Sequence, residues 1–124
     1  MVDKTVKFVV NFIDPALNAE ERDDEAHRLL NQLRDMDEVE SVDRVLDPNP
    51  PEGNKALGAW LAGILMAEVN AGNVKAVFGF LSDRLGGKPI EVEVEANGKK
   101  LKVKAHSREE LTAAIEAVQK FVAA

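Results

Sequence analysis

The N-terminal third of the chain contains a strand pattern followed by a helix pattern. Residues 4–13 form the strand pattern, in which apolar side chains recur at every second position: Val6, Phe8, Val10 and Phe12. Residues 19–36 form the helix pattern, with apolar side chains at intervals of three and four: Ala26, Leu29, Leu30, Leu33 and Met36. Asn18 and Glu21 have the spacing of a capping box, so we expect the helix to begin directly after Asn18.

The middle of the chain contains a weaker strand pattern, a proline-rich turn and a long apolar stretch. Residues 39–46 alternate weakly and predict a second strand. Residues 47–53 contain three prolines, which exclude regular structure and predict a stiff connection. The apolar stretch that follows is interrupted around Gly72, so it predicts two helices, over residues 55–70 and 73–84.

The clearest local signal is a β-hairpin over residues 90–105. Asn97-Gly98 is the preferred sequence for a two-residue type I′ turn. Folding about this turn pairs opposite charges on one face: Glu95 with Lys100, Glu93 with Lys102, and Glu91 with Lys104. The other face is apolar, so a slip of one residue would bury the charges. A last helix begins at Ser107, has Glu110 at the capping-box position, and presents an apolar stripe: Leu111, Ile115, Val118 and Val122.

These elements predict one α+β domain over residues 1–124, in the order β-α-β-α-α-β-β-α. We expect a four-stranded sheet whose C-terminal hairpin is antiparallel and whose helices lie largely on one face. The length of 124 residues suffices for a single core, and 45% apolar and 31% charged residues are typical of a folded domain. The sequence leaves open whether the first two strands are parallel or antiparallel.

The net charge of −6 is distributed unevenly along the chain. Residues 14–52 hold thirteen acidic residues and four arginines, whereas residues 53–124 hold eight acidic residues and ten basic ones. The acidic balance argues against a general nucleic-acid binder, which needs a basic face. The acidic start of the first helix is either a docking surface for a basic partner or a solvated helix face, and its candidate interaction residues are Glu20, Glu21, Asp23 and Asp24.

Few residues are available for chemistry. The chain has no Cys and no Tyr, and it has two histidines, His27 and His106, without the spacing of a metal site. Its three serines lie outside any nucleophile motif, and Ser107 is already explained as a helix cap. We therefore expect no enzymatic activity, no cofactor and no metal. No signal-peptide pattern precedes the first strand, so we expect a cytoplasmic protein.

Residues 56–82 allow three interpretations. They form a buried core, a surface for self-association, or a helical pair that contacts a membrane. Their longest uncharged run, residues 56–67, is shorter than the roughly 18–20 residues that a spanning helix needs. The candidate interaction residues of this stretch are Trp60, Leu61, Leu65, Val77, Phe78 and Phe80.

Over residues 4–122 the chain resembles the bacterial effector-associated constant component family. In that family a strand, a helix and a second strand lead to a proline-rich turn and a Leu-Gly, here Pro50-Pro51-Glu52-Gly53 followed by Ala56-Leu57-Gly58. A Gly- and Ala-rich helical pair follows, here residues 61–81, and then a hairpin around Gly98 and a last helix. The family commonly ends its central helices in Trp-Leu or a basic cluster, where this chain has Phe80-Leu81-Ser82-Asp83-Arg84. We therefore carry over no role for a basic helix end.

The resemblance implies a small non-enzymatic component of bacterial conflict or defence systems, encoded beside effector proteins that include peptidases. Such components are thought to be adaptors or regulators. We therefore expect an interaction module that binds an effector protein or forms a homo-oligomer, through the acidic first helix and the apolar stretch 56–82. The alternative is a membrane-contacting component that inserts the helical pair 56–82.

Overall fold

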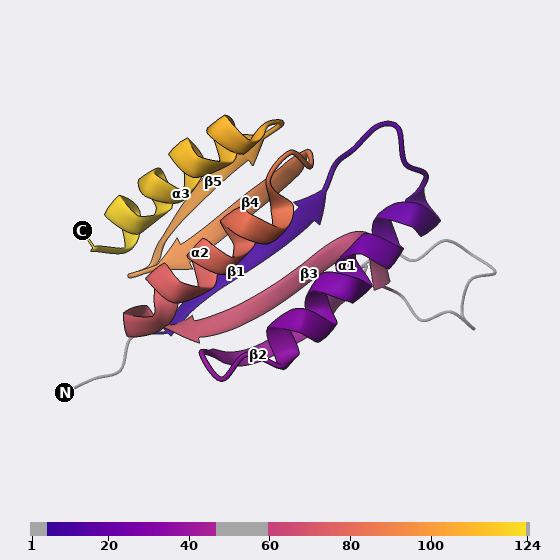
Figure 1. Cartoon of the computed structure of the whole chain (residues 1–124). Coiled ribbons are helices and arrows are strands. Elements are labelled where there is room, and N and C mark those ends of the chain that lie inside the picture. Colours follow the sequence, from indigo (N-terminus) through magenta and orange to yellow (C-terminus); the bar gives the residue numbers. More distant parts are fainter. Residues whose placement is uncertain (1–4, 47–59, 124) are drawn as a thin grey trace.

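The computed structural model describes residues 5–46 and 60–123. The elements are β1 (Thr5–Phe12), α1 (Ala19–Arg34), β2 (Val39–Leu46), β3 (Trp60–Asn70), the short 3-10 helix η2 (Ala71–Asn73), α2 (Val74–Leu85), β4 (Ile90–Ala96), β5 (Lys99–Ala105) and α3 (Arg108–Ala123). The strands form one antiparallel sheet in the order β2-β3-β1-β4-β5. Figure 1 shows α1, α2 and α3 side by side on the same face of this sheet, as expected from the sequence.

The strand order places the first strand at the centre of the sheet. β1 pairs with β3 on one side and with β4 on the other, and β2 lies beyond β3. β1 and β2 therefore run parallel but are separated by β3, which makes β1-α1-β2 a split β-α-β unit. Together, β1 to β4 with α1 and α2 have the ferredoxin-like arrangement, and β5 and α3 extend it.

The predicted helix over residues 55–70 is wrong where the structure describes it, because residues 60–70 form strand β3. The sheet consequently has five strands instead of four, and the described residues contain three α-helices. β3 lies between β2 and β1, and its two faces are both largely apolar. Alternation is hidden in such a strand, and a continuous apolar run is easily read as a buried helix. Residues 47–59, which include the proline-rich turn, lie outside the described residues.

The other predicted elements are confirmed with small shifts of their ends. Asn18 and Glu21 form both bonds of the capping box at the start of α1, with N···O distances of 2.8 and 3.0 Å. The hairpin has the predicted register, and Asn97 and Gly98 have the positive φ angles of a type I′ turn. Ser107 caps α3, whereas the Glu110 carboxylate accepts from the backbone N–H of His106 and not from that of Ser107.

The core lies between the sheet and the helix layer. Alternate residues of β1 point into it, and Phe8 contacts Phe78 of α2 with ring centroids 5.1 Å apart. The fully buried side chains with the largest volumes come from every α-helix and from three strands: Phe8, Phe78, Leu29, Leu33, Leu65, Leu81, Leu85, Ile90 and Leu111. A single core of this kind uses one face of the sheet and leaves the other face to its surroundings.

Candidate interaction surfaces

The predicted acidic surface on α1 divides into structural and free carboxylates. Glu20, Glu21 and Asp24 are exposed, but Glu21 is already part of the capping box. Asp23 is half-buried, forms an ion pair with Arg44 of β2, and accepts a hydrogen bond of 3.2 Å from the backbone N–H of Gly63 in β3. Asp23 thus ties α1 to two strands. Of the four acidic residues, Glu20 and Asp24 are the ones left for a partner.

The predicted apolar interaction residues do not gather on one surface. Leu65, Val77 and Phe78 are at most 1% exposed and belong to the core. Leu61 and Phe80 are half-buried, and Trp60 begins β3, where it pairs with Leu46. A role of these six residues in binding stays a prediction. The three buried residues pack in the hydrophobic core.

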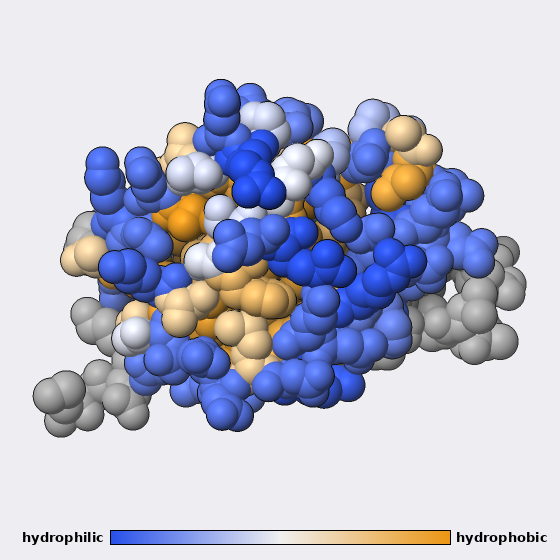
Figure 2. Space-filling model, viewed as in Figure 1, coloured by the Kyte–Doolittle hydropathy of each residue, from blue (hydrophilic) through white to orange (hydrophobic). Residues whose placement is uncertain are grey.

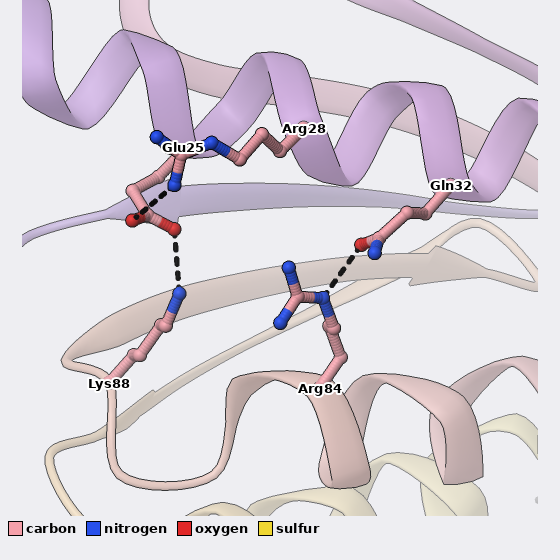
Figure 3. Close-up of polar contacts among 5 residues, drawn as sticks. All are labelled: Glu25, Arg28, Gln32, Arg84 and Lys88. Carbon is pink, nitrogen blue, oxygen red and sulfur yellow. Dashed lines mark hydrogen bonds and ion pairs between the residues drawn. The ribbon is translucent and has the colours of Figure 1, made fainter.

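A polar clasp joins α1 to the end of α2 and the turn that follows it (Figure 3). The carboxylate of Glu25 binds Nζ of Lys88 at 2.6 Å and the guanidinium of Arg28 at 3.2 Å. Nearby, Nε of Arg84 donates to the side-chain oxygen of Gln32 at 2.8 Å. The cavity under the clasp has a volume of only about 10 Å³, which is at most the size for one water. The clasp therefore closes the space between α1 and α2 against a ligand.

The clasp makes folding stability depend on pH. The bond from Lys88 lowers the pKa of Glu25 from its usual value of 4.5. A carboxylate with a lowered folded-state pKa contributes stability above its unfolded pKa and loses it as the pH falls through the folded-state value. We expect Lys88→Met to cost roughly 0.5–1 kcal/mol at pH 7. The cost should shrink as the pH falls below 4.5 and through the lowered folded-state pKa of Glu25, so it should be smaller at pH 3. Urea denaturation at both pH values tests this, with Lys75→Met as the control, and an equal loss at both would contradict it.

A second, open cleft of about 310 Å³ lies between the start of α2 and the end of α3. Its lining is mainly apolar, and the polar side chains in it are Lys75 and Gln119. Small-molecule sites generally combine an apolar wall with several convergent polar groups. Two polar side chains fix the orientation of a ligand poorly, so this cleft is a weak candidate for a small-molecule site.

The face of the sheet opposite the helices is a further candidate surface. None of the described helices covers it, as the arrangement in Figure 1 shows. We call it the open face. In an antiparallel sheet, directly opposite residues point to the same side. The pairing registers therefore place three rows of side chains across the open face: Ser41, Glu68, Lys7, Glu95 and Lys100; Asp43, Met66, Val9, Glu93 and Lys102; Ile64, Asn11, Glu91 and Lys104.

The rows arrange charged and apolar residues in columns along the strands. β5 contributes a column of lysines and β4 a column of glutamates, and ion pairs of 3.6–3.7 Å join the two columns. Lys7 of β1 and Glu68 of β3 form a further ion pair of 3.8 Å. Between the β4 column and Asp43 lie three apolar side chains, Val9, Ile64 and Met66, which we call the apolar strip. Met66 is the one large hydrophobic residue in the described part of the chain that is classed as exposed, at 36%.

The helix side is largely hydrophilic, and Figure 2 shows an apolar area on it around α2. The helix-side residues best placed to bind a partner are the exposed Glu20 and Asp24 on α1 and the half-buried Phe80 on α2. The open face is therefore the principal candidate, and α1 is a secondary one.

Sequence reasoning missed the open face because β3, which lies next to the central strand β1, was read as a helix. With residues 60–70 helical, Glu68 has no partner and Met66 has no neighbour from β1 or β2. One signal was available in the sequence. Glu68 is the single acidic residue of an otherwise apolar run, and Lys7 is a basic residue among the apolar residues of the first strand. The structure places the two directly opposite each other. An isolated charge in an apolar strand calls for an opposite charge on a neighbouring strand.

Residues 5–46 and 60–123 form neither a metal-binding cluster nor a membrane-spanning helix. Within these ranges no three His, Asp or Glu side chains come together as a metal site, and both histidines are exposed. No helix in the same ranges combines the length and the apolar character needed to cross a bilayer. The predicted membrane-inserting helical pair is not formed, because residues 60–70 are a strand inside the sheet.

Comparison with known proteins identifies the family. Neither the curated proteins nor the solved structures contain a match to this chain. The model of one protein family, described as Effector Associated Constant Component 1, matches residues 18–122. This range runs from the cap of α1 into the last turn of α3, so it includes seven of the eight described strands and α-helices. The resemblance drawn from the sequence is thus confirmed, and the chain belongs to the Effector Associated Constant Component 1 family.

Proposed function

We propose that this protein is a non-enzymatic adaptor of an effector-associated system and that it binds an effector protein on the open face. Family membership supports a component of such a system. The observation that supports binding by contact is the open face itself, which combines an apolar strip with charged residues held in fixed register. Specific protein interfaces combine an apolar centre with a polar rim in this way.

The chemistry of the open face favours a protein over a nucleic acid. Open sheet faces that bind single-stranded RNA stack bases on aromatic side chains of their central strands. Here the central strands present Lys7, Val9 and Asn11 from β1 and Ile64, Met66 and Glu68 from β3. The same face also carries the carboxylates of β4, which repel phosphates. A protein surface fits this arrangement better.

Self-association is less well supported than effector binding. It was expected from the apolar stretch 56–82, whose described part consists of β3, η2 and most of α2. Leu65, Val77 and Phe78 of that stretch are buried in the chain's own core and are not available to a second copy. The proposal therefore ranks binding of an effector protein above self-association. It also places this protein in the cytoplasm and includes no membrane contact.

Coexpression with the effector proteins encoded by neighbouring genes tests the proposal. We expect a complex on size-exclusion chromatography with light scattering, and we expect Met66→Lys to weaken it about tenfold or more. Ala76→Lys is the matched control, because Ala76 is exposed on the helix side. The absence of a complex with every such effector would contradict the adaptor role. Equal losses from the two variants would contradict the use of the open face.

A further inference from the structure

The apolar strip has the width of an α-helix. It occupies two adjacent strands, β3 and β1, in which Met66 lies directly opposite Val9, and Ile64 lies two residues further along β3. Neighbouring strands are spaced by about 4.8 Å, so the strip is about 10 Å wide. That is also the diameter of a helix with its side chains. The distance from Met66 to Ile64 is close to one helical turn, about 5–7 Å.

Carboxylates border the apolar strip along both of its long sides. Asp43 of β2 lies directly opposite Met66, and Glu93 of β4 lies directly opposite Val9. Glu91 continues the β4 border beside Asn11. The lysines of β5 lie one strand further out, where they pair with the β4 glutamates. A partner on the strip therefore meets apolar side chains in the middle, the carboxylate of Asp43 on one flank, and on the other flank β4 carboxylates that are shared with the β5 lysines.

We infer that the open face receives an amphipathic helix of the effector protein, one whose apolar stripe is flanked on both sides by Lys or Arg. This inference rests on the proposed function and adds the chemistry of the partner. Apolar side chains one turn apart on such a helix contact Val9, Ile64 and Met66. Basic side chains on its two flanks reach Asp43 on one side and Glu93 on the other. Helix-in-groove recognition by anchors at successive turns is a recurrent mode of peptide binding.

A second copy of this chain fits the strip poorly. Placing strip on strip about a two-fold axis along the strands puts Asp43 of one copy against the β4 glutamates of the other. An axis across the strands puts β4 against β4 and β2 against β2. In both arrangements carboxylates oppose carboxylates, which is unfavourable. Helix α1 of a second copy does not have the chemistry of the proposed partner helix, because its exposed start is acidic and the strip is bordered by carboxylates.

The inference is tested with two synthetic helices of about 18 residues, or about five turns, that share one leucine stripe. One peptide has lysines on both flanks of the stripe, and the other has glutamates. Titration of the full chain is followed by amide chemical shifts. We expect the lysine peptide to shift Val9, Ile64 and Met66, and to bind at least about tenfold more tightly than the glutamate peptide.

Charge reversals separate the strip from general attraction to an acidic protein. Asp43→Lys should weaken binding of the lysine peptide about tenfold. Glu116→Lys, a charge reversal at an exposed residue of α3 on the helix side, should leave the affinity for that peptide unchanged. Both sites are exposed, and circular dichroism checks that both variants fold. Equal losses from both variants, equal binding of both peptides, or shifts confined to the helix side would overturn the inference.

Three further outcomes identify where a failure lies. Concentration-dependent shifts of the strip residues without peptide would mean that a second copy occupies the strip, and would overturn the inference. If the effector complex is sensitive to Met66→Lys but neither peptide binds, the inference fails and the proposed function stands. If no effector binds at all, the proposed function itself fails, and the inference with it.

Discussion

Replacing Phe78 with alanine is expected to lower the free energy of unfolding by about 3–5 kcal/mol. Phe78 is 1% exposed and packs on Phe8, with the two rings tilted and their centroids 5.1 Å apart. The substitution removes the apolar contacts of a whole ring and leaves a cavity between α2 and the central strand. A domain of this size has a total stability of about 5–15 kcal/mol, so the loss is a large part of it. Urea denaturation followed by circular dichroism measures the change.

Phe80→Ala is the matched control for this prediction. Phe80 lies on the same helix two residues further on, but its side chain is half-buried. Because a half-buried ring has less contact area to lose, we expect a cost of roughly 1–2 kcal/mol. Both residues were predicted from the sequence to bind a partner. If Phe78→Ala weakens effector binding at unchanged stability, the assignment of Phe78 to the core is contradicted.

The elements that were predicted correctly depend on residues close together in the sequence. The hairpin requires only the turn at Asn97-Gly98 and alternation on each side of it. The start of α1 requires only the reciprocal bonds of Asn18 and Glu21, three residues apart. Such signals do not depend on the rest of the fold, so the sequence suffices to predict them.

Strand β3 was not predictable in the same way. Its residues include Ala, Leu and Met, which favour helices when tertiary contacts are absent. The strand forms because β1 and β2 supply hydrogen-bonding partners on both of its edges, and those partners are distant in the sequence. Pairing of this kind overrides local propensity. Because the open face depends on β3, the error extended from secondary structure to the candidate site.

Asp23 illustrates the same limit at a single residue. From the sequence alone, Asp23 is one of several acidic residues in the first turns of α1, where the helix dipole stabilises negative charge. The structure adds Arg44, which is 21 residues away, and the backbone of Gly63, which is 40 residues away. Neither partner can be identified without the strand order. Four acidic residues that look equivalent in the sequence therefore differ in role, and a docking test on α1 should change Glu20 and Asp24.

Gly63→Ala is expected to destabilise the fold by about 2–4 kcal/mol, the second largest effect that we predict. Gly63 has a φ of +75°, a conformation that costs a residue with a side chain roughly 1–2 kcal/mol. A Cβ atom there would also lie 3.0 Å from Cβ of Arg22 and 3.5 Å from the carbonyl oxygen of Phe12. Since Cβ of Arg22 is fixed to the backbone of α1, the helix has to move away from β3. That movement weakens the hydrogen bond from Gly63 to Asp23.

Two other glycines separate the causes of this loss. Gly98 has the same φ of +75° but nothing within 4 Å of a new Cβ atom, so Gly98→Ala measures the conformational cost alone, about 1–2 kcal/mol. Gly79 lies in α2 with open space and no positive φ, so Gly79→Ala should be neutral or stabilise by up to about 1 kcal/mol. Thermal unfolding of the three variants should rank Gly63→Ala as the least stable. If Gly63→Ala costs no more than Gly98→Ala, the close approach of α1 to β3 contributes nothing, and the contact that joins α1 to β3 at Arg22 and Asp23 is not a determinant of the fold.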